Sequence, residues 1–527
     1  MEKTLEFLWL MQKSQKHGIQ WCHEQKRLLR GLLTRMSATD ESSSPVLDLL
    51  LETPLVRDRD GESLQRQLLH RIRGAILDGR LPSGCRLPGS RALAAALGIS
   101  RNSVTAVYEL LGAEGYIALS RQGTRVTTLE RLKAEHQRVQ HTASPEISTR
   151  GTRIRDAFFD APDTLALRPG VPALGRFPLS AWKNCLDRAI RSAGVTALGY
   201  GDPQGERALR VAIMQHLAVA RGARCEPEQV VITEGAQEAL SLCIRLVTNP
   251  GQVAWVEEPG WRGAQTALLC GDLNVVPVRV DANGLHVSDD AWNAEAPRLV
   301  YTTPSHQYPT GAVLTASRRL DLIGKAQAHG AWILEDDYDS EFRHSGEPIC
   351  AMQGMVPQAP VLYIGTFSKT LFPSLRLGFV VLPEVLVAKA TPLLRETLRG
   401  GHRYEQLALA EFIESGQFSR HLGRMRRLYR RRLDALRTAL KQHLDVPHVV
   451  MGGDSGMHLT IRLPAECIDR RIAQAARQFD MAPAPLSHFA LCPRPEDNGL
   501  VLGYGNTSES LFVPLIRQLA RLIHEHR

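Results

Sequence analysis

Long hydrophobic runs and paired cysteines are both absent from this sequence. No uninterrupted run reaches the roughly 18 apolar residues that a membrane-spanning helix requires. The nine cysteines are scattered, odd in number and never form a C-x-x-C pair, which argues against a disulfide framework and against a zinc site. A short apolar patch at residues 5–11 lacks a small-residue cleavage site, so it does not predict a signal peptide. We therefore expect a cytoplasmic protein with no membrane contact and no bound metal.

The size and composition predict more than one folded core. At 527 residues the chain exceeds one ordinary domain, and its 43% hydrophobic and 23% charged residues are typical of a globular protein. The formal net charge of +9 favours a polyanionic partner, although many enzymes are equally basic. We expect residues 1–61 to form a poorly ordered N-terminal extension.

Residues 62–128 have the pattern of a small DNA-binding domain. Apolar residues recur at four-residue spacing in a first helix, and glycines and prolines separate it from two shorter ones. Two short strands around a Gln-Gly turn follow. The predicted elements are helices at 64–76, at 90–98 and from 100 onward, and a β-hairpin around 122–123. Three helices and a hairpin predict an α+β winged helix-turn-helix.

The start of the third helix carries the side chains expected to read DNA. In a helix-turn-helix, this helix enters the major groove and contacts bases with its N-terminal residues. Arginine suits a guanine edge, asparagine an adenine edge, and hydroxyls suit phosphates. A polar helix start is also an ordinary property of any three-helix unit, but nine arginines against five acidic residues between positions 61 and 130 favour DNA. The residues concerned are Ser100, Arg101, Asn102 and Thr105.

The stretch GRLPSGCRLPGSRALAAALGISRNSVTAVYELLGAEGYI resembles the GntR family of winged-helix regulators. The resemblance implies that Arg86, Arg91 and Arg101 contact double-stranded promoter DNA. It also implies that Gly123, in the wing, approaches the minor groove.

After a linker predicted for residues 129–162, short apolar runs alternate with helical segments. Strands alternating with helices predict a doubly wound, mainly parallel α/β sheet. Such sheets bind ligands beyond the carboxyl ends of their strands. The predicted strands are residues 230–233, 253–256, 275–280, 299–302, 332–334, 361–365 and 378–382.

Distinctive residues follow four of these strands. Lys369 lies in GTFSKTLFPSLRLGF, Asp336 and Tyr338 lie in EDDYDSEF, the turn 233–237 leads into a helix, and Trp261 follows a fourth strand. Pyridoxal 5'-phosphate (PLP) needs a lysine for its Schiff base and a carboxylate to keep its pyridine nitrogen protonated. It also needs a helix start for its phosphate and an aromatic ring beside its own. Each residue alone has an ordinary structural explanation, but the four together predict a PLP site.

Residues 163–527 are similar to fold-type I aminotransferases, and residues 62–527 resemble the MocR subfamily of GntR regulators. The resemblance is most specific in the two motifs just given and in YGDPQGERALR at 200–210. It implies that Lys369 is the Schiff-base lysine, that Asp336 binds the pyridine nitrogen, that Tyr338 binds the ring hydroxyl and that Trp261 stacks on the ring. The implied phosphate ligands are Gly235, Ala236, Gln237, Thr366, Ser368 and Arg376, with Tyr200 reaching the phosphate of the partner subunit in a homodimer.

The chain departs from typical aminotransferases at two places. The sequence Tyr308-Pro309-Thr310-Gly311 replaces Asn-Pro-x-Gly, so the asparagine beside the ring hydroxyl is missing, a change shared by MocR regulators. The arginine that holds an amino acid's carboxylate in some relatives aligns with Ser487 or His488. Loss of a bidentate cation weakens amino-acid recognition, which argues against true transamination and against an amino-acid effector.

Seven arginines between Phe418 and Leu433 leave two interpretations open. They form either the solvated face of a connecting helix, which is the commoner case, or a secondary patch that binds DNA phosphates. The residues are Arg420, Arg424, Arg426, Arg427, Arg430, Arg431 and Arg432.

These features predict a PLP-dependent transcription regulator whose aminotransferase-like domain senses PLP or a PLP-reactive amine. The alternatives are a functional aminotransferase with an accessory DNA-binding head, and a plain GntR-type repressor whose large domain only dimerises. Arg101 and Asn102 argue against the first, and Lys369 with Asp336 argues against the second. We expect no physiological turnover, with a residual aminotransferase half-reaction left open and RNA polymerase as a further candidate partner.

Overall fold

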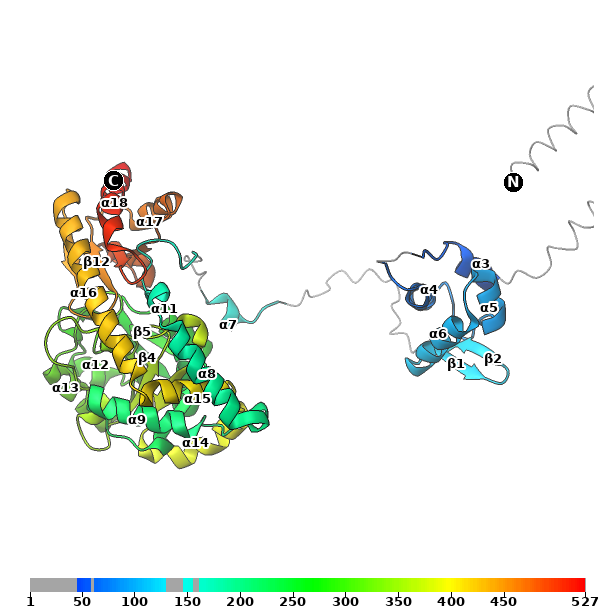
Figure 1. The fold of residues 1–527 in the computed structure, drawn as a ribbon, viewed down its shortest axis with the longest axis horizontal. Coiled ribbons are helices and arrows are strands. Elements are labelled where there is room, and N and C mark those ends of the chain that lie inside the picture. The colour runs from blue at the N-terminus through cyan, green and yellow to red at the C-terminus, as the bar shows by residue number, and fades with distance from the viewer. Residues whose placement is uncertain (1–44, 58–60, 129–145, 155–160, 527) are drawn as a thin grey trace, which may run out of the picture. The chain divides into compact units, whose positions relative to one another are not determined.

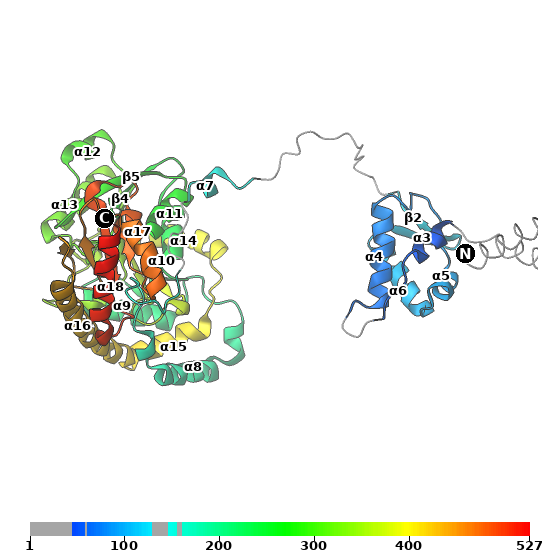
Figure 2. The same ribbon diagram turned by 90° about the horizontal axis from the view of Figure 1, so that it is seen from above.

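The computed structural model describes residues 45–57, 61–128, 146–154 and 161–526. They belong to two compact units, residues 1–144 and 145–527, which are drawn in Figures 1 and 2. Most of the predicted extension (1–61) and of the predicted linker (129–162) lies outside the described residues. Within the described ranges, no helix combines the length and the apolar character needed to cross a bilayer.

The N-terminal unit contains the predicted winged helix-turn-helix. Its buried residues form one apolar cluster to which each described helix and both described strands contribute. Helix α3 lies within the range 1–61, where the sequence suggested no element, and its Leu50 is fully buried in this cluster. The elements are α3 (Pro45–Leu51), α4 (Leu64–Leu77), α5 (Ser90–Leu97), α6 (Arg101–Ala113) and the antiparallel pair β1 (Ile117–Ser120) and β2 (Gly123–Val126).

Two caps form the tight turn between α5 and α6. Helix α5 ends at Gly98, whose φ of +64° is in the left-handed region that glycine adopts without strain. Helix α6 begins after Ser100, whose Oγ accepts a hydrogen bond of 3.1 Å from the Ser103 amide. The three residues between the helices therefore present the start of α6 at the surface.

The large unit is built on an eight-stranded mixed sheet in the order β3-β10-β9-β8-β7-β4-β5-β6. All seven predicted strands are present. The five central strands β9, β8, β7, β4 and β5 are parallel, β10 is antiparallel to both β3 and β9, and β6 is antiparallel to β5. The bounds are β3 (Val230–Thr233), β4 (Val253–Glu258), β5 (Asn274–Asp281), β6 (Gly284–Leu285), β7 (Leu299–Thr302), β8 (Trp332–Asp337), β9 (Val361–Thr366) and β10 (Gly378–Val381).

Helices cover both faces of this sheet, as a doubly wound fold requires. Side chains alternate along a strand, so Val231 packs in one cluster with α10, α11 and α14, whereas Val230 and Ile232 pack in another with α8, α9 and α15. The short helix α7 (Thr149–Thr152) lies within the predicted linker. The following helices are α8 (Leu179–Ala193), α9 (Arg207–Arg221), α10 (Ala236–Val247), α11 (Arg262–Cys270), α12 (Asp289–Ala294), α13 (Ala316–His329), α14 (Glu384–Thr397) and α15 (Arg403–Glu414).

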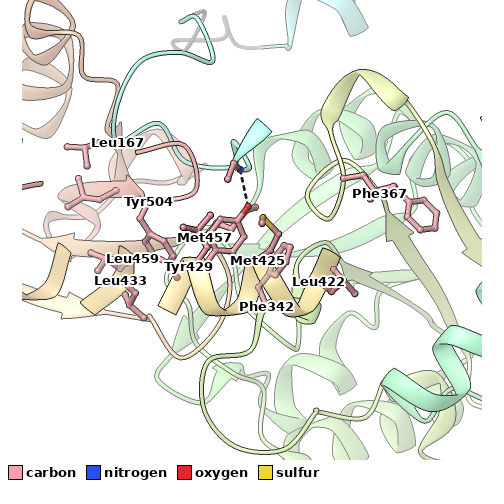
Figure 3. Packing of buried hydrophobic residues seen from close by; sticks show 14 of the residues in the cluster. Leu167, Phe342, Phe367, Leu422, Met425, Tyr429, Leu433, Met457, Leu459 and Tyr504 are labelled. Carbon is pink, nitrogen blue, oxygen red and sulfur yellow. Dashed lines mark hydrogen bonds between the residues drawn. The ribbon is translucent and has the colours of Figure 1, made fainter. Parts of the chain in front are cut away.

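A long helix, α16 (Gln417–His443), connects the large sheet to a second, antiparallel sheet in the order β11-β12-β14-β13. Its buried side chains share one apolar cluster with residues of both sheets. In Figure 3, the hydroxyl of Tyr429 on α16 accepts a hydrogen bond of 3.0 Å from the Ala173 amide. The remaining elements are β11 (Val449–Met451), β12 (His458–Arg462), α17 (Asp469–Ala476), β13 (Ala484–Pro485), β14 (Gly499–Gly503) and α18 (Phe512–Glu525).

Candidate cofactor site and DNA-reading helix

A cavity of about 350 Å³ lies where the predicted PLP residues meet. This volume lies within the range of small-molecule sites. Its lining includes side chains from the ends of β4, β7, β8 and β9, from the start of α10 and from β12 of the second sheet. The predicted residues among them are Ala236, Gln237, Trp261, Asp336, Tyr338, Thr366, Ser368, Lys369 and Arg376.

Asp336, near the end of β8, is buried with only one of its two oxygens satisfied. Oδ2 accepts a hydrogen bond of 2.7 Å from the Tyr301 hydroxyl, while Oδ1 has no hydrogen-bond partner among the described residues. Burial raises the pKa of this carboxyl to about 7, although the Tyr301 hydroxyl partly opposes the shift. A protonated ring nitrogen would pair Oδ1 and favour the charged carboxylate, so this site fits the pyridine of PLP.

The raised pKa of Asp336 predicts a pH-dependent stability of the PLP-free protein. A carboxyl whose pKa rises from 3.8 to about 7 on folding binds its proton more tightly in the folded state, so its contribution makes stability fall as the pH rises through this window. Asp336→Asn should therefore raise the free energy of unfolding at pH 8, by up to about 4 kcal/mol at 1.36 kcal/mol per pKa unit. The gain should nearly vanish at pH 4. Urea unfolding of both proteins at the two pH values measures this difference, and an equal difference at both would contradict the shift.

Lys369 follows β9, and its amine lies inside the cavity. Nζ donates a hydrogen bond of 2.8 Å to the carbonyl of Gly170. Burial lowers the pKa of this amine, and the nearby Asp339 opposes part of the shift. A larger fraction of neutral amine suits a nucleophile that attacks an aldehyde. Gly170 was missed by sequence reasoning because it lies near the start of the domain, far from any predicted motif.

The start of α10 lines the cavity together with three other residues predicted to bind the phosphate, and we call this part of the cavity the α10 corner. Gly235 precedes the helix with a φ of +87°. The amides of Ala236 and Gln237 belong to the first turn of the helix, where backbone N–H groups are available to bind an anion. Thr366 Oγ1 donates a hydrogen bond of 3.1 Å to Ser368 Oγ. The Arg376 guanidinium lies 3.7 Å from the position that a Cβ on Gly235 would occupy. A helix start, two hydroxyls and a cation together fit a phosphate group.

Tyr338 lines the cavity and is held by a buried network that sequence reasoning missed. Its hydroxyl donates a hydrogen bond of 2.9 Å to the carbonyl of His306, and His306 Nδ1 lies 2.9 Å from Asp339 Oδ1. His458 of β12 packs against His306, and the ligating atoms of the two histidines and Asp339 lie within 4.8 Å of one another. Burial lowers the pKa of His458 well below its usual value. Asp339 belongs to EDDYDSEF, but His458, in a distant strand, gave no sequence pattern.

The two departures from aminotransferase sequences are both accounted for in the structure. Tyr308 lines the cavity in place of the missing asparagine. Ser487 donates from its amide and its hydroxyl to Asp469, each over 2.8 Å. The His488 ring contacts the guanidinium of Arg262, with 3.3 Å between Nδ1 and Nη1. The guanidinium of Arg262 therefore lies beside His488, one of the two positions that align with the expected arginine.

The residues predicted to read DNA lie at the surface of the N-terminal unit. Arg86, Arg91, Ser100, Arg101 and Asn102 are exposed, and Thr105 and Gly123 are half-buried. Within the described part of this unit, Arg91 and Arg101 have no ion-pair partner.

The structure also explains the glycine in the wing. Residues 84–87 pair with β2, because the Leu87 amide donates to the Thr124 carbonyl over 2.9 Å. This pairing brings Arg86 over Gly123, where a Cβ would lie 2.9 Å from Arg86 Nε. The absence of a side chain at Gly123, whose φ is +120°, thus makes room for the guanidinium.

Comparisons with known proteins match both units. Residues 64–126 match the family model "Bacterial regulatory proteins, gntR family", and residues 168–482 match "Aminotransferase class I and II". The chain is 39% identical over 456 residues to the probable rhizopine catabolism regulatory protein MocR of Rhizobium meliloti, covering 85% of this chain and 92% of that protein. It is 31% identical over 477 residues to the pyridoxine biosynthesis transcriptional regulator PdxR of Corynebacterium glutamicum, covering 88% and 96%.

A solved structure with the same fold is LysN, the α-aminoadipate aminotransferase of Thermus thermophilus, in complex with N-(5'-phosphopyridoxyl)-L-leucine. It is 25% identical with a TM-score of 0.66, covering 72% of this chain and 97% of its own. With the fit of Asp336, Lys369 and the α10 corner, this fold identifies PLP as the cofactor. When bound, PLP supplies an aldehyde that reacts with amines and a ring that accepts electrons. The chain is a DNA-binding transcription regulator, and it belongs to the MocR subfamily of the GntR family.

Proposed function

We propose that this regulator senses an amine, or PLP itself, through the cavity at Lys369 and that occupancy of the cavity changes its binding to DNA. The observation that carries the proposal is the pairing in one cavity of a desolvated amine, Lys369, with a buried carboxylate oxygen on Asp336 that no described group satisfies. In this assignment Lys369 forms the Schiff base and Asp336 holds the pyridine nitrogen. Tyr338 binds the ring hydroxyl, and Trp261 stacks on the ring. The phosphate ligands are Gly235, Ala236, Gln237, Thr366, Ser368 and Arg376.

The identity of the effector is the part of the function that the proposed PLP ligands leave open. Two relatives with the same architecture are named for different pathways, rhizopine catabolism and pyridoxine biosynthesis. Tyr308 and His458 also line the cavity, and neither is among the proposed PLP ligands. An effector shifts DNA binding only if it binds the two states of the regulator with different affinity. We expect no physiological turnover.

A paired titration tests the proposal. PLP-loaded protein is titrated with candidate amines while its visible spectrum and its affinity for labelled promoter DNA are followed in the same samples. An effector should change the spectrum and the DNA affinity with the same midpoint. If amines that change the spectrum all leave DNA binding unchanged, and removal of PLP leaves it unchanged as well, occupancy of the cavity does not control DNA binding by the N-terminal unit.

The functional unit we propose is a homodimer. Tyr200 is 87% exposed and lies outside the cavity of its own chain. Further exposed apolar residues lie on the preceding elements η1 (Leu174–Arg176), α8 and η2 (Gly194–Leu198), and exposed apolar patches mark protein interfaces. The exposed apolar residues are Leu174, Leu179, Ile190, Val195 and Leu198. A second copy of the chain would cover them and bring Tyr200 to the partner's cavity.

Mixed dimers test the role of Tyr200. Tyr200→Phe should weaken PLP binding about fivefold, the equivalent of one hydrogen bond at roughly 1 kcal/mol. Tyr200→Phe chains are mixed with Lys369→Ala chains. If Tyr200 serves the partner's site, each mixed dimer has one intact site, made of Lys369 from the first chain and Tyr200 from the second. The mixed dimer should then bind half the parental amount of PLP at the parental affinity. If each chain uses its own Tyr200, mixed dimers contain no intact site, which would contradict the assignment.

A further inference from the structure

Helix α16 is the most basic element among the residues that the structure describes. Its 27 residues contain eight arginines and one lysine against a single acidic residue, Asp434, in a chain whose formal net charge is +9. The sequence left open whether these arginines are a solvated face or a phosphate-binding patch. The structure divides them into two sets.

The apolar residues of α16 fix which face of the helix points outward. Leu422, Met425, Tyr429 and Leu433 are buried, and Figure 3 shows them packed toward the core. At 3.6 residues per turn, positions spaced by four, three and four residues on the opposite side share one line. These positions are Arg420, Arg424, Arg427 and Arg431, all of them exposed. We call this set the arginine stripe.

The other arginines of α16 bind loops of the same unit. Arg426 donates to the Glu341 carbonyl over 2.5 Å, and Arg430 donates to the His344 carbonyl. Arg437 donates to the Gly452 carbonyl over 3.2 Å, and the buried Arg432 donates to the Gly505 carbonyl. These side chains are structural, since they satisfy backbone acceptors beside the helix. Within the described residues, Arg420 is the one member of the arginine stripe that also donates to a backbone carbonyl.

The arginine stripe has few partners for its charge. Arg420 reaches the Ser415 carbonyl over 3.1 Å and Arg431 lies 3.3 Å from Glu509, both at the surface. In the ranges that the structure describes, Arg424 and Arg427 have neither a side-chain hydrogen bond nor an ion pair. Along the stripe, each of these two has only other arginines three and four residues away. Solvated helix faces usually alternate in sign, and like charges at this spacing destabilise a helix by about 0.2–0.5 kcal/mol per pair.

We propose that the arginine stripe binds the phosphate backbone of double-stranded DNA beside the bases that α6 reads. From Arg420 to Arg431 the stripe is about 16 Å long at 1.5 Å per residue. Each DNA strand carries one phosphate per roughly 3.4 Å of helix axis, so the stripe matches about five phosphates. Arginine rather than lysine makes up the stripe, and the planar guanidinium suits phosphate oxygens. The N-terminal unit, joined to the same chain, holds DNA at high local concentration.

The test compares two charge-matched double variants of the full-length, PLP-loaded protein. Arg424→Gln/Arg427→Gln removes two charges from the stripe, while Arg395→Gln/Arg471→Gln removes two exposed charges from α14 and α17. Affinity for a promoter duplex is measured from 50 to about 200 mM salt, a range over which phosphate contacts change affinity strongly. The stripe variant should show a slope of log K against log salt that is shallower by about 2 for each stripe of the homodimer that contacts the duplex, at roughly 0.9 per lost phosphate contact. The control should retain the parental slope.

Four outcomes are decisive. On a duplex trimmed to the operator, the stripe variant should bind as the parent does, because the flanking phosphates are gone. Equal slopes for parent and stripe variant on the long duplex, or an equal loss in the control, would overturn the proposal. The proposal would also be overturned if the stripe variant kept the parental salt slope on DNA but bound RNA polymerase more weakly. The stripe would then bind an acidic protein. Arg101→Ala, run in parallel, separates this failure from a failure of DNA reading by α6.

Discussion

Replacement of Lys369 by alanine should leave a protein that no longer retains PLP covalently. Among the described residues that line the cavity, Lys369 is the only lysine, so no neighbouring amine takes its place. The visible absorbance that a lysine-bound PLP produces should disappear after gel filtration. The fold should persist, because the lost side chain makes a single hydrogen bond, to Gly170, worth about 1 kcal/mol.

The matched control is Lys389→Ala, which removes an exposed lysine from α14 and should keep the parental spectrum. The Lys369 variant should also lose the effect of amines on DNA affinity while keeping basal binding by the N-terminal unit. Retention of the parental spectrum by Lys369→Ala would rule out the assignment. Loss of the spectrum with an unchanged response to amines would instead separate sensing from the Schiff base.

The parts of the site that could be predicted are those tied to strand ends. A parallel sheet brings the carboxyl ends of its strands to one edge. Residues at or just beyond the ends of β4, β8 and β9 therefore had to meet once the strands were recognised, and Trp261, Asp336 and Lys369 do line one cavity. The turn before α10 follows the same logic, because its glycine and the helix start are both local features of the sequence.

The parts that could not be predicted depend on partners distant in the chain. Tyr301 looks like any buried strand residue, yet its hydroxyl holds Asp336 from the neighbouring strand β7. His458 reaches the cavity from a second sheet, whose placement depends on α16 rather than on any motif. The direction of β10 was equally hidden, since an apolar run of four residues is the same in parallel and antiparallel pairing. Helix α3 was not included in the predicted domain, because one short apolar segment does not indicate which other helices it packs against.

Arg101→Ala should remove sequence recognition rather than DNA binding as such. Arg101 is the first residue of α6, is exposed and has no ion-pair partner within the described part of its unit. A bidentate contact to a guanine edge is worth about 1–3 kcal/mol of discrimination, so affinity for the operator should fall by roughly 5- to 150-fold. Affinity for a scrambled duplex should change far less, and the measurement is therefore the ratio of the two dissociation constants.

The control for Arg101 is Arg66→Ala, which removes an exposed arginine from α4 in the same unit, where it pairs with Glu62 over 3.5 Å. Both variants lose one positive charge, so general attraction to phosphates falls equally in each. Only a base contact lowers the operator affinity without lowering the scrambled affinity in proportion. A ratio that stays at the parental value in Arg101→Ala would mean that α6 does not read bases through this residue. Specificity would then have to come from Asn102, from the wing at Gly123, or from the shape of the DNA.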